Sequence, residues 1–277
     1  MICCSKNYMK CSMKNTLIYT VCTSDYDYLF PENIKKILPH CDIKFLCIDC
    51  KTVPYPYGVN LDRSVYPKFK TNYLLSRYLK TNIFKIYPNY KHFVYLDGNV
   101  IIKKSFERVL DKFINSEKQI LVKKHPLRNS LIDEFKFLLN NSKIKDKNKL
   151  QAIESQMLHL DINNQEALLT ENNIFMFKKN SKVENYFEDW FFEIKKWSTR
   201  DQLCNPVLLR RFNKKELAVW IPSKKNLTYQ VNGHKNNKSI YRIYNWVHCR
   251  RHIALYCAME FIFRPIYYLF LKFSATK

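Results

Sequence analysis

A short polar segment that interrupts an apolar stretch between residues 90 and 106 constrains the fold of this chain most. The apolar run Phe93–Leu96 meets Asp97-Gly98-Asn99, and a second apolar run, Val100–Ile102, follows at once. Aromatic and β-branched residues that stop at polar ones predict a buried strand ending in a tight turn. Residues two apart in extended backbone point to the same side, so Asp97 and Asn99 can face one divalent cation, which takes the rest of its shell from water and phosphates. The alternative is an Asp-Gly hairpin turn between two strands, and the triplet alone favours it.

The surrounding pattern predicts an α/β domain. Residues 16–22 and 43–49 read as strands, with a short helix over 33–38 between them, and residues 68–86 read as one helix. Strands that alternate with helices predict a three-layer α/β fold. Because ligands of such sheets sit outside the carboxyl ends of the strands, we expect the site near Thr23, Asp49 and Asp97.

Two basic residues on the predicted helix 68–86 share a face. Arg77 and Lys80 are three residues apart and lie just upstream of the acidic turn. Arginine meets a diphosphate through its planar fork, and lysine meets it as a point charge. A solvated basic face is the more common fate of such a pair.

Two later segments carry candidate side chains. His125-Pro126-Leu127-Arg128, with Glu134 downstream, predicts a polar loop at a strand end, because Pro126 forces His125 out of helical geometry. Ser198 and Asp201 have the spacing of a helix cap. Asp201 is therefore either a cap or, with Gln202, part of the catalytic group: a general base in an inverting enzyme, or a stabiliser of the sugar cation in a retaining one.

Charge and cysteines narrow the function classes. The 277 residues carry a formal net charge of +23, which suits a polyanion, an anionic membrane surface or phosphorylated ligands. The basic residues are scattered and no nucleic-acid motif accompanies them, so nucleic-acid binding remains an alternative that we do not favour. The ten cysteines lack the spacing of a zinc site or a disulfide framework, and we expect reduced thiols.

Four segments together resemble one family. IYTVCTSDYDYL, SRYLKTNIFKIYPNYKHFVYLDGNVII, HPLRNSLIDEF and WSTRDQL occur in this order over roughly residues 16 to 222. They are similar to segments of a GT-A-type glycosyltransferase family that includes plant mucilage-related and turgor-regulation proteins. Ser24 stands where that family's pattern has glycine, and Ser130, Ile132 and Asp133 also depart from it.

The resemblance implies a fold, a reaction and a set of site residues. The fold is a GT-A-like, Rossmann-like nucleotide-sugar-binding fold with a mixed sheet. The reaction is metal-dependent transfer of a sugar, hexosyl or pentosyl, from a nucleotide sugar, most simply a UDP-sugar, to a glycan or glycoprotein. Asp201-Gln202 followed by Asn205 resembles the retaining glycogenin-like transferases, which slightly favours retention. The implied residues are Asp97 and Asn99 for Mn or Mg, Asp201 and Gln202 for catalysis, and Thr20, Tyr26, Arg77, Lys80, His125, Arg128, Glu134 and Arg200 for donor or substrate binding. A glycan-binding protein of the same fold without turnover is an alternative.

The two ends of the chain are expected to lie outside this domain. We divide the chain into a basic leader (1–15), the glycosyltransferase-like domain (16–230) and a basic, aromatic helical extension (231–277). Residues 253–273 are apolar but interrupted by charges, which predicts attachment to a membrane surface or a partner without spanning the bilayer. Cys3, Cys4 and Cys11 precede any hydrophobic region and do not fit a signal peptide, so we expect a cytoplasmic protein or one on the cytoplasmic membrane face.

Overall fold

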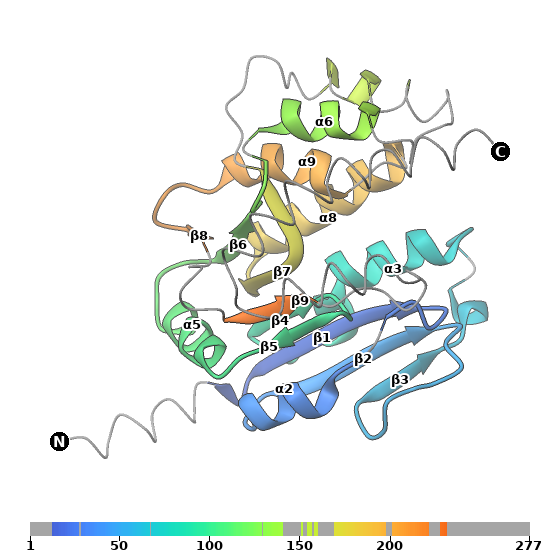
Figure 1. Cartoon of the computed structure of the whole chain (residues 1–277), viewed down its shortest axis with the longest axis vertical. Coiled ribbons are helices and arrows are strands. Elements are labelled where there is room, and N and C mark those ends of the chain that lie inside the picture. Colours follow the sequence, from blue (N-terminus) through green and yellow to red (C-terminus); the bar gives the residue numbers. More distant parts are fainter. Residues whose placement is uncertain are drawn as a thin grey trace, which may run out of the picture.

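A mixed seven-stranded sheet divides the protein into three layers (Figure 1). The computed structural model describes residues 13–27, 29–66, 68–128, 130–140, 151, 154–156, 158–159, 169–197, 201–221 and 228–231. Its elements are β1 (Thr16–Thr23), α2 (Pro31–Ile37), β2 (Asp42–Ile48), β3 (Gly58–Leu61), η1 (Arg63–Val65), α3 (Asn72–Thr81), α4 (Ile83–Ile86), β4 (His92–Leu96), β5 (Val100–Ile102), α5 (Ser105–Ile114), β6 (Ile120–Lys124), α6 (Leu131–Asn140), β7 (Thr170–Lys178), α8 (Ser181–Trp197), α9 (Asp201–Leu208), η3 (Leu209–Arg211), β8 (Leu217–Trp220) and β9 (Tyr229–Val231).

The strand directions bring several strand ends to one edge of the sheet. The order is β3-β2-β1-β4-β7-β6-β8, and β3, β2, β1 and β4 run parallel to one another. Strand β7 runs antiparallel to both β4 and β6, whereas β8 is parallel to β6. The carboxyl ends of β1, β2 and β4 therefore meet at the same edge. The mixed, three-layer α/β architecture expected from the sequence is confirmed.

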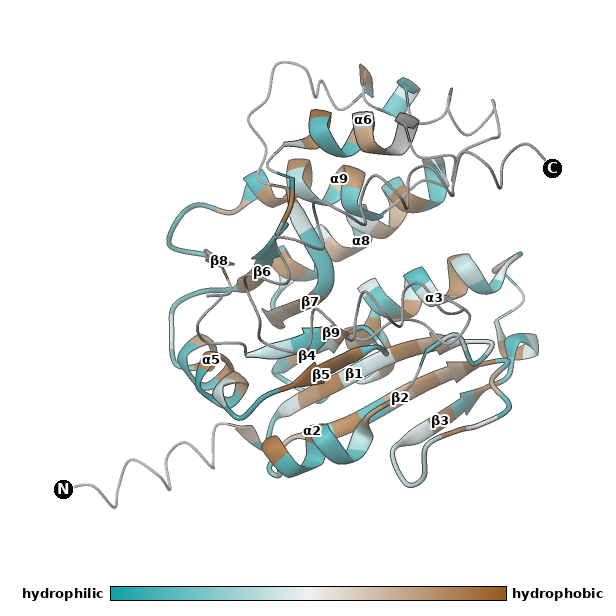
Figure 2. Ribbon diagram, in the orientation of Figure 1, coloured by the Kyte–Doolittle hydropathy of each residue, from teal (hydrophilic) through white to brown (hydrophobic). Residues whose placement is uncertain are grey.

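Each face of the sheet has its own core because strand side chains alternate. On β4, Phe93 and Tyr95 face α3, α8 and α9, whereas Val94 and Leu96 face α2 and α5. Figure 2 shows the hydrophobic residues concentrated along the central strands. Aromatic stacking joins β4 to β7: the ring centroids of Phe93 and Phe177 lie 4.8 Å apart, and those of Tyr95 and Phe175 lie 4.9 Å apart.

The predicted helix 68–86 is two helices. The side chain of Thr71 caps α3 by accepting from the backbone N–H of Leu74 at 3.2 Å. Asn82 ends α3 with φ −116° and ψ 26°, and its side chain donates to the Thr81 hydroxyl. Threonine and asparagine side chains compete with the helical backbone for hydrogen bonds, which favours a break here.

The Asp-Gly hairpin interpretation is wrong. Strand β5 does not pair with β4 but forms a separate two-stranded sheet with β9. The turn is closed by the N–H of Val100, which donates to the Asp97 carbonyl at 3.0 Å, and it is anchored by the Asp97 N–H, which donates to the Asn173 carbonyl at 2.8 Å. The turn is thus held from β7, and the chain leaves the large sheet after Asp97.

Gly98 is needed for close packing and not for a left-handed backbone, because no glycine among the described residues has a positive φ. A Cβ at position 98 would lie 2.8 Å from both Cβ and Oδ2 of Asp27 and 3.0 Å from Cδ2 of Leu29. Ser24, in contrast, has φ 50°, in the left-handed region that favours glycine. The loop after β1 therefore folds tightly against the turn after β4.

Among the residues that the structure describes, no helix has both the length and the apolar character to cross a bilayer. The leader up to residue 12 and the extension from residue 232 onward lie outside the described residues, so the predicted attachment through 253–273 stays a prediction.

The packing at Gly98 gives a stability prediction. Gly98→Ala should lower the free energy of unfolding by roughly 1–3 kcal/mol, because the added methyl group overlaps Asp27 and the loop must shift. Urea denaturation of the variant and the wild type measures this loss.

The control is a double-mutant cycle with Asp27→Gly, which removes the Cβ and the carboxylate that the new methyl group would strike. The cost of Gly98→Ala should be much smaller in that background. An equal cost in both backgrounds would show that Asp27 is not the obstacle.

Candidate active site

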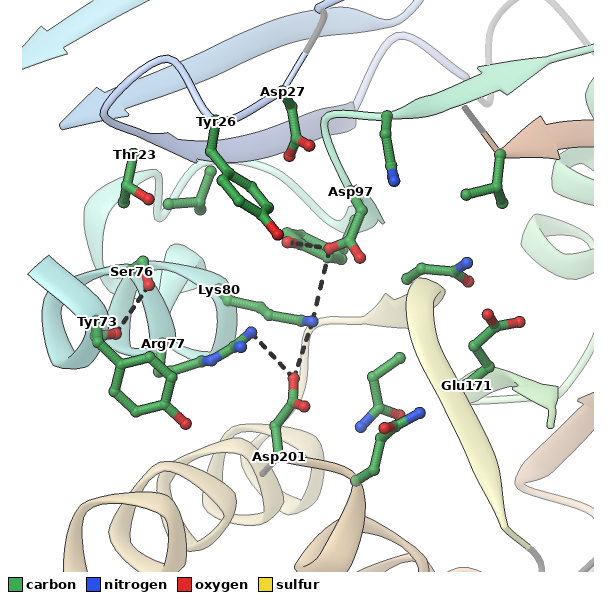
Figure 3. Close-up of a pocket in the computed structure, with 17 residues that line it drawn as sticks. Thr23, Tyr26, Asp27, Tyr73, Ser76, Arg77, Lys80, Asp97, Glu171 and Asp201 are labelled. Atoms are coloured by element: carbon green, nitrogen blue, oxygen red, sulfur yellow. Dashed lines mark hydrogen bonds and ion pairs between the residues drawn. The ribbon is translucent and has the colours of Figure 1, made fainter. Parts of the chain in front are cut away.

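A cavity of about 660 Å³ opens where β1 and β4 end, between α3 and the start of α9 (Figure 3). It lies outside the carboxyl ends of the parallel strands, as expected for a ligand site of an α/β sheet. Most of the side chains that line it are polar or charged. They belong to Val21, Thr23, Tyr26, Asp27, Tyr73, Ser76, Arg77, Lys80, Tyr95, Asp97, Asn99, Glu171, Asn172, Asn173, Asp201, Gln202 and Val231.

A buried ammonium group lies at the centre of this cavity. The Lys80 side chain is 3% exposed, and its Nζ donates to Oδ2 of Asp201 at 3.0 Å. The same Nζ lies 3.8 Å from Oδ1 of Asp97 and 4.5 Å from the ring centroid of Tyr95. Lys80 therefore joins α3, the end of β4 and the start of α9 through two carboxylates and an aromatic face.

Arg77 shares Asp201 with Lys80. Its Nη1 donates to the same Oδ2 at 3.2 Å, and its guanidinium lies 5.1 Å from the ring centroid of Tyr73. Burial acts to lower the pKa of Arg77, but Asp201 acts to raise it and the net pKa lies above the ordinary value. Both predicted phosphate ligands are thus cations that line the cavity and converge on one carboxylate oxygen.

Asp97 turns toward the same centre. The Tyr95 hydroxyl donates to Oδ1 of Asp97 at 2.6 Å, and burial, with Asp97 next, raises the pKa of Tyr95 well above its usual range. Tyr95 therefore remains a protonated donor. The Asp97 side chain is 35% exposed, and Asn99 and Asp27 also line the cavity. Side chains with oxygen atoms from the turn after β4 and from the loop after β1 therefore line the same cavity.

Three buried amides form another part of the cavity wall. Asn172, Asn173 and Gln202 are 5%, 8% and 6% exposed, and each has a buried polar atom without a hydrogen-bond partner among the described residues: Nδ2, Oδ1 and Oε1, respectively. Unsatisfied buried polar groups are costly and call for an explanation. Because all three residues line the cavity, their amide groups are suited to bind the hydroxyl groups of a ligand.

A hydrogen-bond network behind this wall fixes Asn172. Asn205 donates from Nδ2 to Oδ1 of Asn172 at 2.7 Å and to the Thr170 hydroxyl at 3.0 Å, and it accepts from the Tyr186 hydroxyl. Trp190 donates from Nε1 to the Asp201 carbonyl at 3.0 Å, which holds the start of α9. Asn172 and the start of α9 are therefore held in place by the fold.

Not all predicted site residues line the cavity. Tyr26 does so, and Figure 3 shows its ring pointing toward Asp97. Thr20 is buried in β1 and donates to the Leu96 carbonyl at 2.9 Å, so it links two strands. Arg200, like Ser198, lies outside the described residues.

The predicted loop residues form a separate cluster. His125 Nδ1 accepts from the backbone N–H groups of Leu127 and Arg128 at 3.2 and 2.9 Å. The Arg128 guanidinium is ion-paired with Glu134, which is fully buried, and lies 4.1 Å from the ring centroid of Phe137. None of His125, Arg128 and Glu134 is among the residues that line the cavity.

The sequence analysis missed several residues that line the cavity, chiefly Asp27, Tyr73, Glu171, Asn172 and Asn173. The available signal was Glu171-Asn172-Asn173, three polar residues directly before an apolar strand, which resembles the polar break after Phe93–Leu96 in reverse order. Tyr73 lies one helical turn before Arg77, on the same face of α3.

Comparison with known proteins adds little at the level of residues. No family model and no curated protein sequence matches the chain. Among solved structures, the galactosyltransferase LgtC in complex with donor and acceptor sugar analogs is similar, with a TM-score of 0.40 and 10% sequence identity over 73% of this chain and 72% of that chain. Membership of the family that the four segments resemble stays a prediction.

The central ion pairs give a prediction of stability. Lys80→Met should lower the free energy of unfolding by roughly 3 kcal/mol, because it removes the buried cation shared by Asp201 and Asp97, so that Asp201 keeps its ion pair with Arg77 but loses the one with Lys80. Denaturant titration at neutral pH measures the loss.

Lys85→Met, on the neighbouring helix α4, is the matched control. Lys85 pairs with Glu188 on the surface, where both side chains are 45% exposed, and such pairs contribute about 0–1 kcal/mol. Similar losses in the two variants would contradict a central role for Lys80.

Proposed function

We propose that this protein is a glycosyltransferase that moves a sugar from a nucleotide-diphosphate sugar to a glycan or glycoprotein acceptor. The observation that carries the proposal is the meeting of three kinds of group in one cavity: the cations Arg77 and Lys80, the carboxylate of Asp97, and the buried amides of Asn172, Asn173 and Gln202. Cations suit a diphosphate, and amides suit the hydroxyl groups of a sugar.

The two cations support binding of the diphosphate. In the described structure both are ion-paired with the single carboxylate of Asp201. An incoming diphosphate offers several oxygen atoms to the same donors and therefore competes with Asp201 for them. Because Oδ2 of Asp201 already accepts from both cations, we assign Asp201 the task of holding Arg77 and Lys80 in place, with Gln202 beside it facing the sugar.

A divalent cation fits the turn after β4. Asp97 and Asn99 both line the cavity, and Asp27 packs against Gly98 between them. Among the described residues, no three His, Cys, Asp or Glu side chains gather as a metal site. This donor set suits a Mn or Mg ion that is held by Asp97 and Asn99 and completed by water and phosphate oxygens. Such a cation supplies positive charge against the departing diphosphate.

The two alternative functions would give different experimental results. A glycan-binding protein of this fold would bind a glycan without releasing a nucleoside diphosphate. A nucleic-acid-binding protein would bind oligonucleotides with an affinity that falls steeply as salt increases. The buried amides favour a small, hydroxyl-rich ligand over a nucleic-acid backbone.

The direct test is a thermal-shift screen of nucleotide sugars and nucleoside diphosphates with and without Mn. A ligand that binds only the folded state at 100 times its Kd adds about 2.7 kcal/mol of stability. We expect a UDP-sugar with Mn to raise the melting temperature and a suitable acceptor to release UDP. A full screen with no ligand-dependent shift would contradict the proposal.

Arg77→Ala should separate phosphate binding from nucleoside binding. A charge-assisted hydrogen bond is worth roughly 1.5–3 kcal/mol, so affinity for UDP should fall about tenfold or more. Affinity for uridine should stay unchanged, because it has no phosphate for Arg77 to contact. Calorimetric titration of both ligands measures this, and equal losses would instead indicate a folding defect.

Asp97→Ala should abolish the dependence of nucleotide binding on Mn while the protein stays folded. The reason is that Asp97 is the carboxylate that we assign to the cation, and its side chain lines the cavity and is 35% exposed. Titration of UDP at increasing Mn measures the effect. A variant that binds UDP in Mn as tightly as the wild type would refute the assignment of the metal ligand.

A further inference from the structure

A second buried lysine lies behind the cavity wall, on the strands rather than on α3. The Lys123 side chain on β6 is 1% exposed, and its Nζ donates to the Tyr229 hydroxyl on β9 at 2.8 Å. The same Nζ is ion-paired with Oε2 of Glu171 on β7 and lies 4.4 Å from the Tyr229 ring centroid. Lys123 thus connects three strands without lining the cavity.

Glu171 is the member of this group that reaches the cavity. Its side chain is 27% exposed and lines the cavity, whereas Lys123 is enclosed. Burial lowers the pKa of Lys123, and Glu171 acts against that shift. Figure 3 shows Glu171 on the side of the cavity away from Arg77 and Tyr73. A carboxylate is therefore held by Lys123 from behind and lies on the side of the cavity away from Arg77.

The two carboxylates differ in what they can do. The Asp201 side chain is 10% exposed, and its Oδ2 accepts from two cations. Glu171 is more exposed and is paired with a single lysine. A group that takes a proton from a ligand must be within reach of it, and Glu171 satisfies this better than Asp201.

We propose that Glu171 is the catalytic residue that accepts the proton of the acceptor hydroxyl, with Lys123 as its positioning residue. This inference rests on the proposed glycosyl transfer. The acceptor oxygen forms a bond to the anomeric carbon, and the bond from that carbon to the diphosphate oxygen breaks. The electron pair leaves with the diphosphate, the hydroxyl proton passes to Glu171, and it is then released to water.

The placement of Glu171 also bears on the stereochemistry at the anomeric carbon of the transferred sugar. A base on the side of the cavity away from Arg77 suits direct displacement, which inverts the anomeric carbon. The proposed role of Glu171 therefore favours inversion, whereas the resemblance found in the sequence slightly favours retention. The anomeric configuration of the isolated product, measured by NMR, reports on this point.

The test compares full-length wild-type protein with Glu171→Gln, which keeps the shape but loses the charge. Turnover with donor and acceptor should fall roughly 10²–10⁴-fold, the usual contribution of a general base. The Kd for the nucleotide sugar in Mn should keep its wild-type value. Glu188→Gln is the matched control, because it breaks the surface pair between Lys85 on α4 and Glu188 on α8, and it should keep wild-type turnover.

Chemical rescue separates catalysis from support of the fold. Added formate should restore part of the turnover of Glu171→Ala, because it can occupy the vacated place beside Lys123. The double variant Glu171→Ala, Lys123→Met should not respond, since it lacks the ammonium group that would hold formate. A purely structural role for the pair would give no rescue in either variant, and that result would overturn the inference.

Three other outcomes would also decide whether Glu171 has this role. Wild-type turnover in Glu171→Gln would overturn the role of Glu171 while leaving the proposed function intact. A loss of donor affinity equal to the loss of turnover would make Glu171 a donor-binding residue and overturn the proton transfer. A wild-type protein that binds no nucleotide sugar would refute the proposed function, and this inference with it.

Discussion

The buried ammonium group of Lys80 is the interaction on which the rest of the site depends. Removing a lysine from water costs several kcal/mol unless opposite charges compensate it. Here the compensation comes from Asp201 at 3.0 Å and Asp97 at 3.8 Å. The two carboxylates lie on elements that are far apart in sequence, so the charge of Lys80 fixes α3, the end of β4 and the start of α9 in one arrangement. Trp190 adds a neutral hydrogen bond that holds α9 in place.

Such a cluster is a costly way to hold a fold together. A well-packed apolar group would often stabilise as much as a buried ion pair does. The amide wall adds to the cost, since polar atoms of Asn172, Asn173 and Gln202 lack partners among the described residues. Charges and unsatisfied amides that meet in one cavity are explained together if a ligand supplies the missing contacts. A diphosphate would bind the cations, and the hydroxyl groups of a sugar would bind the amides.

The sequence predicted the parts of this site that local pattern determines. The end of a buried strand located Asp97 and Asn99, and helical spacing placed Arg77 and Lys80 on one face, which indeed lines the cavity. The pairing of that face with Asp201 depends on tertiary packing, which no local pattern reveals. The same reason explains the hairpin error: β5 pairs with β9, a strand near the far end of the described chain. His125, Arg128 and Glu134 have residue types that suit a ligand, yet they satisfy one another.

The polar start of β7 shows most clearly why sequence periodicity missed part of the site. In a regular strand, neighbouring side chains point to opposite faces, so Glu171, Asn172 and Asn173 should not all face one cavity. The ladder between β6 and β7 is irregular between Val122 and Lys124, and β7 extends past the end of β4, where the Asn173 carbonyl accepts from Asp97. Irregular strand pairing is common beside active sites because it redirects side chains. The same irregularity includes Lys123, whose ammonium group is ion-paired with Glu171. The irregular part of the ladder therefore contains both the polar residues of β7 that line the cavity and the cation that holds Glu171.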